Sequence, residues 1–132
     1  MYLLDTNTCI FIKNRKPPHV LEKLRSVIEQ TVHLSSITVA ELQFGVYNSQ
    51  NIEKNRIALM EFLAPFEIID FDDRDAEHFG MIRSHLKKEG KLIGPYDMLI
   101  AAQAVARDLI LVTNNTNEFE RIKVLKLEDW KE

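Results

Sequence analysis

A short apolar run that ends in a carboxylate most constrains the fold of this 132-residue chain. Residues 2–4 are Tyr-Leu-Leu, and Asp5 follows them directly. Such a run predicts a buried strand of a parallel sheet. Open α/β sheets bind their ligands at the carboxyl ends of their strands. We therefore expect Asp5 to lie at the edge of the sheet where chemistry takes place.

Three further acidic residues occupy comparable places after apolar segments, namely Glu41, Asp97 and Glu118. If the strands are parallel, these side chains and Asp5 meet at one sheet edge. Carboxylates packed together repel one another, so a fold keeps such a cluster only where a cation or shared protons neutralise it. Mg²⁺ and Mn²⁺ prefer oxygen ligands. The pattern therefore favours a site for a hard cation, with Asp5 as its strongest candidate ligand.

Each of the four acids also has a simpler structural explanation. Asp5 could cap a helix, Asp97 could complement a helix dipole, and Glu118 could be a solvated loop residue. Thr38 and Glu41 have the spacing of a capping box, in which Glu41 bonds back to the start of its helix. The sequence alone leaves these alternatives open.

Alternating strand and helix patterns predict a parallel sheet covered by helices on both faces. The expected strands are 2–4, 32–37, 66–71, 109–113 and a short edge strand at 123–127. Helices are expected at 6–14 with Thr6 or Asn7 as cap, 20–28, from Thr38 onward, 51–65, from Asp72 or Asp73 to Gly90, and 96–107. The acids Asp70, Asp72, Asp73 and Asp75 are expected to be caps and part of a solvated face.

The composition indicates one globular domain spanning residues 1–132, with 45% hydrophobic and 28% charged residues. No apolar run approaches the roughly 20 residues that span a bilayer, and the start of the chain lacks the basic segment of a secretory signal. The single cysteine, Cys9, fits a reducing compartment. We therefore expect a cytoplasmic protein. Its net charge of −3 argues against a broad nucleic-acid-binding surface but permits a local basic rim.

Other catalytic schemes find less support. The four histidines lack HxxxH or HxH spacing, which disfavours a zinc site. Cys9 lies among apolar residues and is expected to be buried. A phosphatase of the haloacid-dehalogenase type would need a second acid two residues after Asp5, where Asn7 stands. A phospho-receiver domain would need a lysine after the last central strand, and residues 112–115 supply none.

Four motifs, in order, resemble those of a known family. They are Leu-Asp-Thr-Asn at 4–7, Ala-Glu-Leu at 40–42 with Gly45, Ile-Gly-Pro-Tyr-Asp at 93–97 running into Ile-Ala-Ala at 100–102, and Val-Thr-Asn-Asn at 112–115 with Glu118-Phe119. Over essentially its full length the chain resembles the PIN-domain ribonucleases, specifically the VapC toxins of VapBC toxin–antitoxin pairs. The resemblance implies a PIN-like three-layer α/β/α domain with a central parallel sheet.

The resemblance also implies the site. It makes Asp5, Glu41, Asp97 and Glu118 catalytic around one or two Mg²⁺ or Mn²⁺ ions, held by Asp5, Asp97 and Glu118. Neighbouring polar side chains would orient the ligands or waters: Thr6, Asn7, Thr113 and Asn115. Two departures stand out, because Glu118 replaces an Asp common in relatives and Asn115 stands where some have an acid. A longer acid reaches farther, which leaves the number of metals open.

The activity implied is endonucleolytic cleavage of looped or structured RNA, often tRNA, by a toxin. A VapB-type antitoxin would block the site, promoter DNA would be bound only through the antitoxin, and the toxin would form a homodimer. The alternative is a catalytically inactive PIN-like domain that only engages an antitoxin or another partner. Tyr96, beside Asp97, could either stack on a base or pack within the fold.

Overall fold

A five-stranded parallel sheet forms the centre of the computed structural model, which describes residues 1–27 and 31–131. The strand order is β3-β2-β1-β4-β5. The strands are β1 (Tyr2–Leu4), β2 (Val32–Ser35), β3 (Glu67–Ile69), β4 (Ile110–Val112) and β5 (Lys126–Glu128). The helices are α1 (Thr6–Asn14), α2 (Pro18–Ser26), α3 (Ser36–Tyr47), α4 (Ile52–Leu63), α5 (Asp73–Lys88), α6 (Pro95–Ala106) and α7 (Thr116–Phe119).

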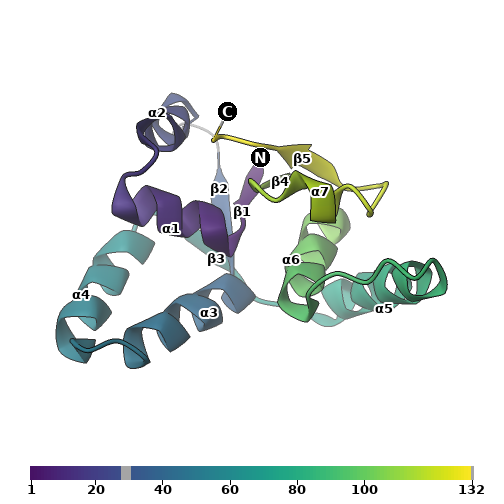
Figure 1. The fold of residues 1–132 in the computed structure, drawn as a ribbon, viewed down its shortest axis with the longest axis horizontal. Coiled ribbons are helices and arrows are strands. Elements are labelled where there is room, and N and C mark those ends of the chain that lie inside the picture. Colours follow the sequence, from purple (N-terminus) through teal and green to yellow (C-terminus); the bar gives the residue numbers. More distant parts are fainter. Residues whose placement is uncertain (28–30, 132) are drawn as a thin grey trace.

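Helices cover both faces of the sheet, with α1 to α4 on one side and α5 and α6 on the other (Figure 1). Side chains of a strand point alternately to its two faces, and β1 divides its residues accordingly. Tyr2 and Leu4 join the core under α1 to α4, whereas Leu3 joins the core under α5 and α6. The three-layer α/β/α arrangement with a central parallel sheet is therefore confirmed.

No helix in the described part of the chain is both long enough and apolar enough to cross a membrane. The predicted strands and helices are all present; the strand at 2–4 and the helix at 6–14 have the predicted bounds, and the others have shifted ends. The helix expected at 20–28 begins earlier, at Pro18, and ends at Ser26, and residue 28 of that prediction lies outside the described residues.

The start of α3 corrects the capping-box prediction for Thr38. Strand β2 ends at Ser35, so Ile37 is helical rather than extended. Ser35 caps the helix, because its hydroxyl accepts a hydrogen bond from the Ile37 amide at 3.0 Å. Thr38 is buried inside the helix, and Glu41 lies in its second turn. Glu41 is therefore free of the capping role that the spacing suggested.

Helix α1 is capped by Asp5 and not by Thr6 or Asn7, which are its first helical residues. The Asp5 Oδ1 atom accepts a hydrogen bond from the Thr8 amide at 2.8 Å. An N-cap residue typically has extended backbone, and Asp5 has it because it directly follows β1. Asp5 therefore caps α1 and also lies at the sheet edge where the sequence predicted a cation site.

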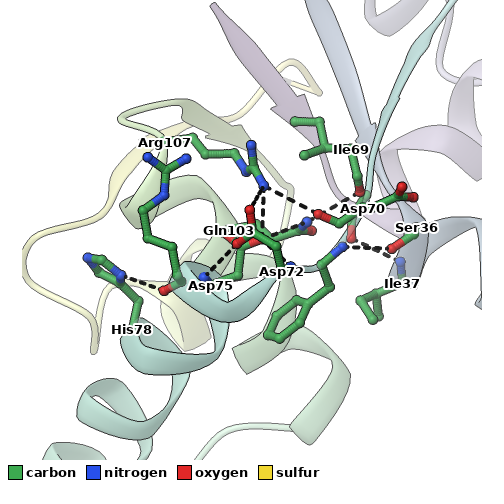
Figure 2. Close-up of polar contacts among 12 residues, drawn as sticks. Ser36, Ile37, Ile69, Asp70, Asp72, Asp75, His78, Gln103 and Arg107 are labelled. Carbon is green, nitrogen blue, oxygen red and sulfur yellow. Dashed lines mark hydrogen bonds and ion pairs between the residues drawn. The ribbon is translucent and has the colours of Figure 1, made fainter.

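A second group of acids lies around Arg107, the residue that follows α6 (Figure 2). The Arg107 Nη2 atom lies 3.1 Å from Asp75 Oδ2 and 3.2 Å from Asp72 Oδ2. Gln103 Nε2 lies 3.4 Å from the same Asp75 oxygen. The expectation of a cap is confirmed for Asp72, which forms a capping box with Asp75. The expectation of a solvated face is wrong for Asp75, which is fully buried because Arg107 pairs with it. We call these residues the Arg107 cluster.

Candidate active site

The four predicted carboxylates come from separate elements. Asp5 ends β1, Glu41 lies in α3 directly after β2, Asp97 lies in the first turn of α6, and Glu118 lies in α7 after β4. Helix α7 occupies a stretch that the sequence suggested was a polar loop, and Phe119 anchors it in the core. We call these four side chains the open carboxylate site.

The raised pKa of Asp97 indicates that these carboxylates interact. Burial raises the pKa of Asp97 to about 7, with further increases from a hydrogen bond to Glu118 and from the negative charges of Glu118, Asp5 and Glu41. Each charge disfavours a further charge on Asp97. The structure therefore brings all four predicted acids into one electrostatic neighbourhood.

Asp5 is the most buried of the four, with 3% of its surface exposed. Burial raises its pKa, and the charge of Glu41 adds to this effect. Hydrogen bonds from the Thr113 side chain and the Thr8 amide act in the opposite direction, because they stabilise the carboxylate. Thr113, one of the polar residues predicted to orient ligands, therefore lies against Asp5.

Glu41 is held by a hydroxyl from another helix. The Thr6 Oγ1 atom lies 2.7 Å from Glu41 Oε1 and 3.2 Å from Thr38 Oγ1. Thr6 thus connects the first turn of α1 to α3 and fixes one oxygen of Glu41. Asn7, also predicted to orient ligands, is an exposed residue of that turn.

Glu118 is held from two directions. Its Oε1 atom accepts a hydrogen bond from the Gly94 amide at 3.0 Å, and its Oε2 atom accepts one from the Asn115 side-chain amide. The Asn115 backbone amide in turn donates to Thr113 Oγ1 at 3.0 Å. Sequence reasoning missed the Gly94 amide, although the Gly-Pro turn before α6 was a visible signal. Asn115, which stands where some relatives have an acid, thus donates a hydrogen bond to Glu118 and adds no negative charge to the site.

The four carboxylates are oxygen ligands of the kind that a hard cation prefers. Their side chains are not arranged as a ligand shell in this structure. Among residues 1–27 and 31–131, no three His, Cys, Asp or Glu side chains are grouped so as to hold a metal ion. Asp5, Glu41 and Glu118 each face a hydrogen-bond donor of the protein instead. All four candidate metal ligands are carboxylates, and the pKa of Asp97 is raised by burial first and then by the negative charges of Glu118, Asp5 and Glu41, which no cation offsets in the described residues. A divalent cation would offset these charges.

Cys9 does not offer a nucleophile, as expected from its apolar neighbours. It is fully buried. Burial raises the pKa of its thiol well above the usual value, and the charge of Asp5 raises it further. Because the thiolate is the reactive form, such a thiol is inert.

Comparisons with known proteins agree with this geometry. The sequence model of the PIN domain matches residues 2–125. The chain is 42% identical over 129 residues to a tRNA(fMet)-specific endonuclease VapC of Salmonella typhimurium, covering 98% of this chain and 97% of the relative. It is 43% identical over 129 residues to a ribonuclease VapC2 of Haemophilus influenzae, with the same coverage of both.

A solved relative has the same fold. The crystal structure of VapBC2 from Rickettsia felis, bound to a DNA fragment from the promoter of the pair, superposes with a TM-score of 0.92. The match covers 98% of each chain at 42% identity. The family model, the relatives and the fold thus agree over nearly the whole chain, and the resemblance of its motifs is confirmed. The chain belongs to the PIN-domain family, among its VapC ribonucleases.

Proposed function

We propose that this chain is a metal-dependent endoribonuclease toxin that cleaves a structured or looped RNA, with tRNA as the first candidate. The substrate class follows from the relative named for tRNA(fMet). The observation that carries the proposal is the open carboxylate site, where burial and the three neighbouring acids raise the pKa of Asp97 to about 7. A perturbed carboxyl group of this kind, surrounded by like charges, is typical of a functional site.

Asp5, Asp97 and Glu118 would hold the Mg²⁺ or Mn²⁺ ion, and Glu41 would complete the site or position the attacking water. When bound, the cation would lower the pKa of that water and stabilise charge on the scissile phosphate. The protein's own donors fix the acids around it: Thr6 orients Glu41, and the Gly94 amide and Asn115 orient Glu118. Asn7 and Thr113 are assigned to the same orienting role.

A VapB-type antitoxin is the proposed partner, because solved relatives are VapBC complexes, some of them bound to DNA. Promoter DNA would then be bound only through the antitoxin. We also propose a homodimer, a cytoplasmic location and a single PIN domain over residues 1–132. The inactive binding domain, the alternative left by the sequence, finds no support among relatives that are named as ribonucleases.

Cleavage of total tRNA by the purified, partner-free chain tests the proposal. Mg²⁺ should give discrete fragments, which EDTA and the substitution Asp5→Asn should both abolish. Asn keeps an oxygen that can cap α1, so the variant should remain folded by circular dichroism. Asp73→Asn is the matched control, because it removes one exposed acid from the first turn of α5.

Two results would contradict the proposal. One is intact tRNA, ribosomal RNA and messenger RNA after incubation with folded protein and Mg²⁺. The other is cleavage that persists in EDTA, which would leave nuclease activity but remove its dependence on a metal.

A further inference from the structure

An apolar cavity adjoins the open carboxylate site at Glu41. Its volume is about 490 Å³, and it is lined by Ile37, Ala40, Glu41 and Phe44 of α3 and by Tyr96 of α6. Glu41 therefore belongs to both the cavity and the carboxylate site. A group bound at one place is within direct reach of the other.

Two aromatic side chains of this cavity face solvent. Phe44 is 69% exposed and Tyr96 is 58% exposed, so the packing alternative for Tyr96 does not hold. Phe44 follows Glu41 by one turn of α3, and residues three or four apart lie on one helix face. Tyr96 directly precedes Asp97. Each aromatic residue thus lies within one helix turn of a carboxylate of the site.

We propose that this cavity receives one unpaired nucleobase next to the scissile phosphate, stacked on Phe44 or Tyr96. The inference rests on the proposed ribonuclease function and adds a binding subsite to it. Exposed aromatic rings are the common stacking platforms of proteins that bind single-stranded nucleic acid. They tolerate any base, because every base has a π face.

The charge of the cavity favours a base as its occupant. The cavity has one charged lining residue, Glu41, whose sign would repel a phosphate. A phosphodiester at the carboxylates would therefore direct its neutral base, and not its backbone, into this cavity.

This placement would give the site a preference for looped RNA. A base within a duplex is paired and stacked on its neighbours, whereas a loop base can turn outward at little cost. The cavity would thus select for an unpaired nucleotide at the cleavage point without reading its identity.

Fluorescence of 2-aminopurine in RNA hairpins tests the subsite directly. The analogue is placed at one loop position at a time, and Asp5→Asn protein keeps the RNA intact. Stacking should quench the signal at one position. Adding Phe44→Leu or Tyr96→Leu should remove the quench and weaken binding by roughly 5- to 150-fold, the range for one stacked base. Leucine keeps the apolar character of the wall, so loss of quenching reports the ring itself.

Tyr47→Leu is the matched control. Tyr47 is another exposed aromatic residue of α3, 61% accessible, and it is not a lining residue of the cavity. Its removal should leave both quenching and affinity unchanged. An equal effect of all three substitutions, or no quenching at any loop position, would overturn the subsite.

Cleavage of an abasic RNA separates the subsite from the function on which it rests. Removing the base beside the cleaved bond should lower kcat/KM of the wild-type protein by roughly 5- to 150-fold and that of the Phe44→Leu variant far less. Equal losses in both proteins would overturn the subsite while leaving the ribonuclease function intact. Absence of any cleavage would overturn that function, and the fluorescence assay would still decide the subsite. If Phe44→Leu weakened only antitoxin binding, the cavity would belong to the protein partner, and the proposal would be wrong.

Discussion

The two groups of carboxylates in this protein differ in what balances their charge. In the Arg107 cluster, a guanidinium lies 3.1 Å from Asp75 and 3.2 Å from Asp72. The pKa of Asp72 is lowered there by a hydrogen bond from the Asp75 amide and by the charge of Arg107. In the open carboxylate site, no Lys, Arg or His of the described residues forms an ion pair with the four acids, and the pKa of Asp97 rises to about 7.

The difference separates acids that hold the fold together from acids that we propose to bind the cation. The Arg107 cluster joins the start of α5 to the end of α6 and to the end of β3 through the Asp70 carbonyl. The open carboxylate site uses neutral donors, a threonine hydroxyl and backbone or side-chain amides, which orient the acids but leave their charge in place. Such a site lowers stability in exchange for function.

The largest expected effect comes from breaking the balanced cluster with Arg107→Met. Asp75 is fully buried, so its carboxylate would remain in the core without a cation. Removing one partner of a buried ion pair is strongly destabilising. We expect a loss of about 3 kcal/mol in the free energy of unfolding, because Arg107 itself is partly exposed. Urea denaturation followed by circular dichroism measures it.

A second substitution distinguishes the charge from the packing of Arg107. Asp75→Asn in the Arg107→Met background removes the orphaned charge and should recover part of the lost stability. Arg83→Met, on an exposed position of α5, should change stability by less than about 0.5 kcal/mol. Wild-type stability in Arg107→Met would show that the two acid groups do not differ in the way described.

The opposite substitution in the open carboxylate site, Asp97→Asn, should stabilise the metal-free protein at neutral pH. Because the folded-state pKa of Asp97 lies above its usual value of 3.8, folding favours the protonated form. That contribution is full below pH 4 and is lost as the pH rises through about 7. After allowance for solvent screening we expect the variant to gain about 2 kcal/mol relative to wild type across this range.

The difference in unfolding free energy between the two proteins, measured from pH 4 to pH 8 in EDTA, tests this expectation. It should grow with pH and level off above pH 7. Mg²⁺ should then stabilise the wild-type protein at pH 7.5 more than the variant, because a ligand stabilises the state that binds it. A difference that is flat with pH would mean that neither burial nor the neighbouring acids raise the pKa of Asp97.

The sequence predicted the open site better than the balanced one for a physical reason. Asp5 and Glu118 follow apolar strands, and parallel strands bring such residues to one edge whatever the details of packing. Asp75 and Arg107 are 32 residues apart. The residues around Asp75 form a charged segment typical of a surface, so the local sequence does not predict that this one acid is buried. The burial of Asp75 depends on its ion pair with Arg107, which forms only when the chain folds.

The boundaries of α3 and the new helix α7 show a different limit. Thr38 and Glu41 matched a capping box in spacing, but the helix begins where the hydrogen bonds of β2 end, and Ser35 stands at that point. Helix α7 has only one turn, held by the burial of Phe119. The aromatic cavity was equally hidden, because exposure of Phe44 depends on how α3 and α6 pack and not on the residues of either helix alone.

The smallest expected effect tests whether neutral donors organise the open carboxylate site. Thr6→Val removes the hydroxyl that contacts Glu41 at 2.7 Å, with little change in volume or charge. Loss of a donor that orients a site carboxylate should lower RNA cleavage about 10-fold, while stability falls by no more than about 1 kcal/mol, since the same hydroxyl also contacts Thr38. Thr6→Ser keeps the hydroxyl and should retain most of the activity. A loss of activity in both variants would mean that the methyl group of Thr6 matters, whereas activity unchanged in Thr6→Val would mean that Glu41 needs no such donor. Thr6 and Arg107 can then be compared directly. Arg107 neutralises an acid and controls stability, whereas Thr6 only orients an acid and controls the rate of cleavage.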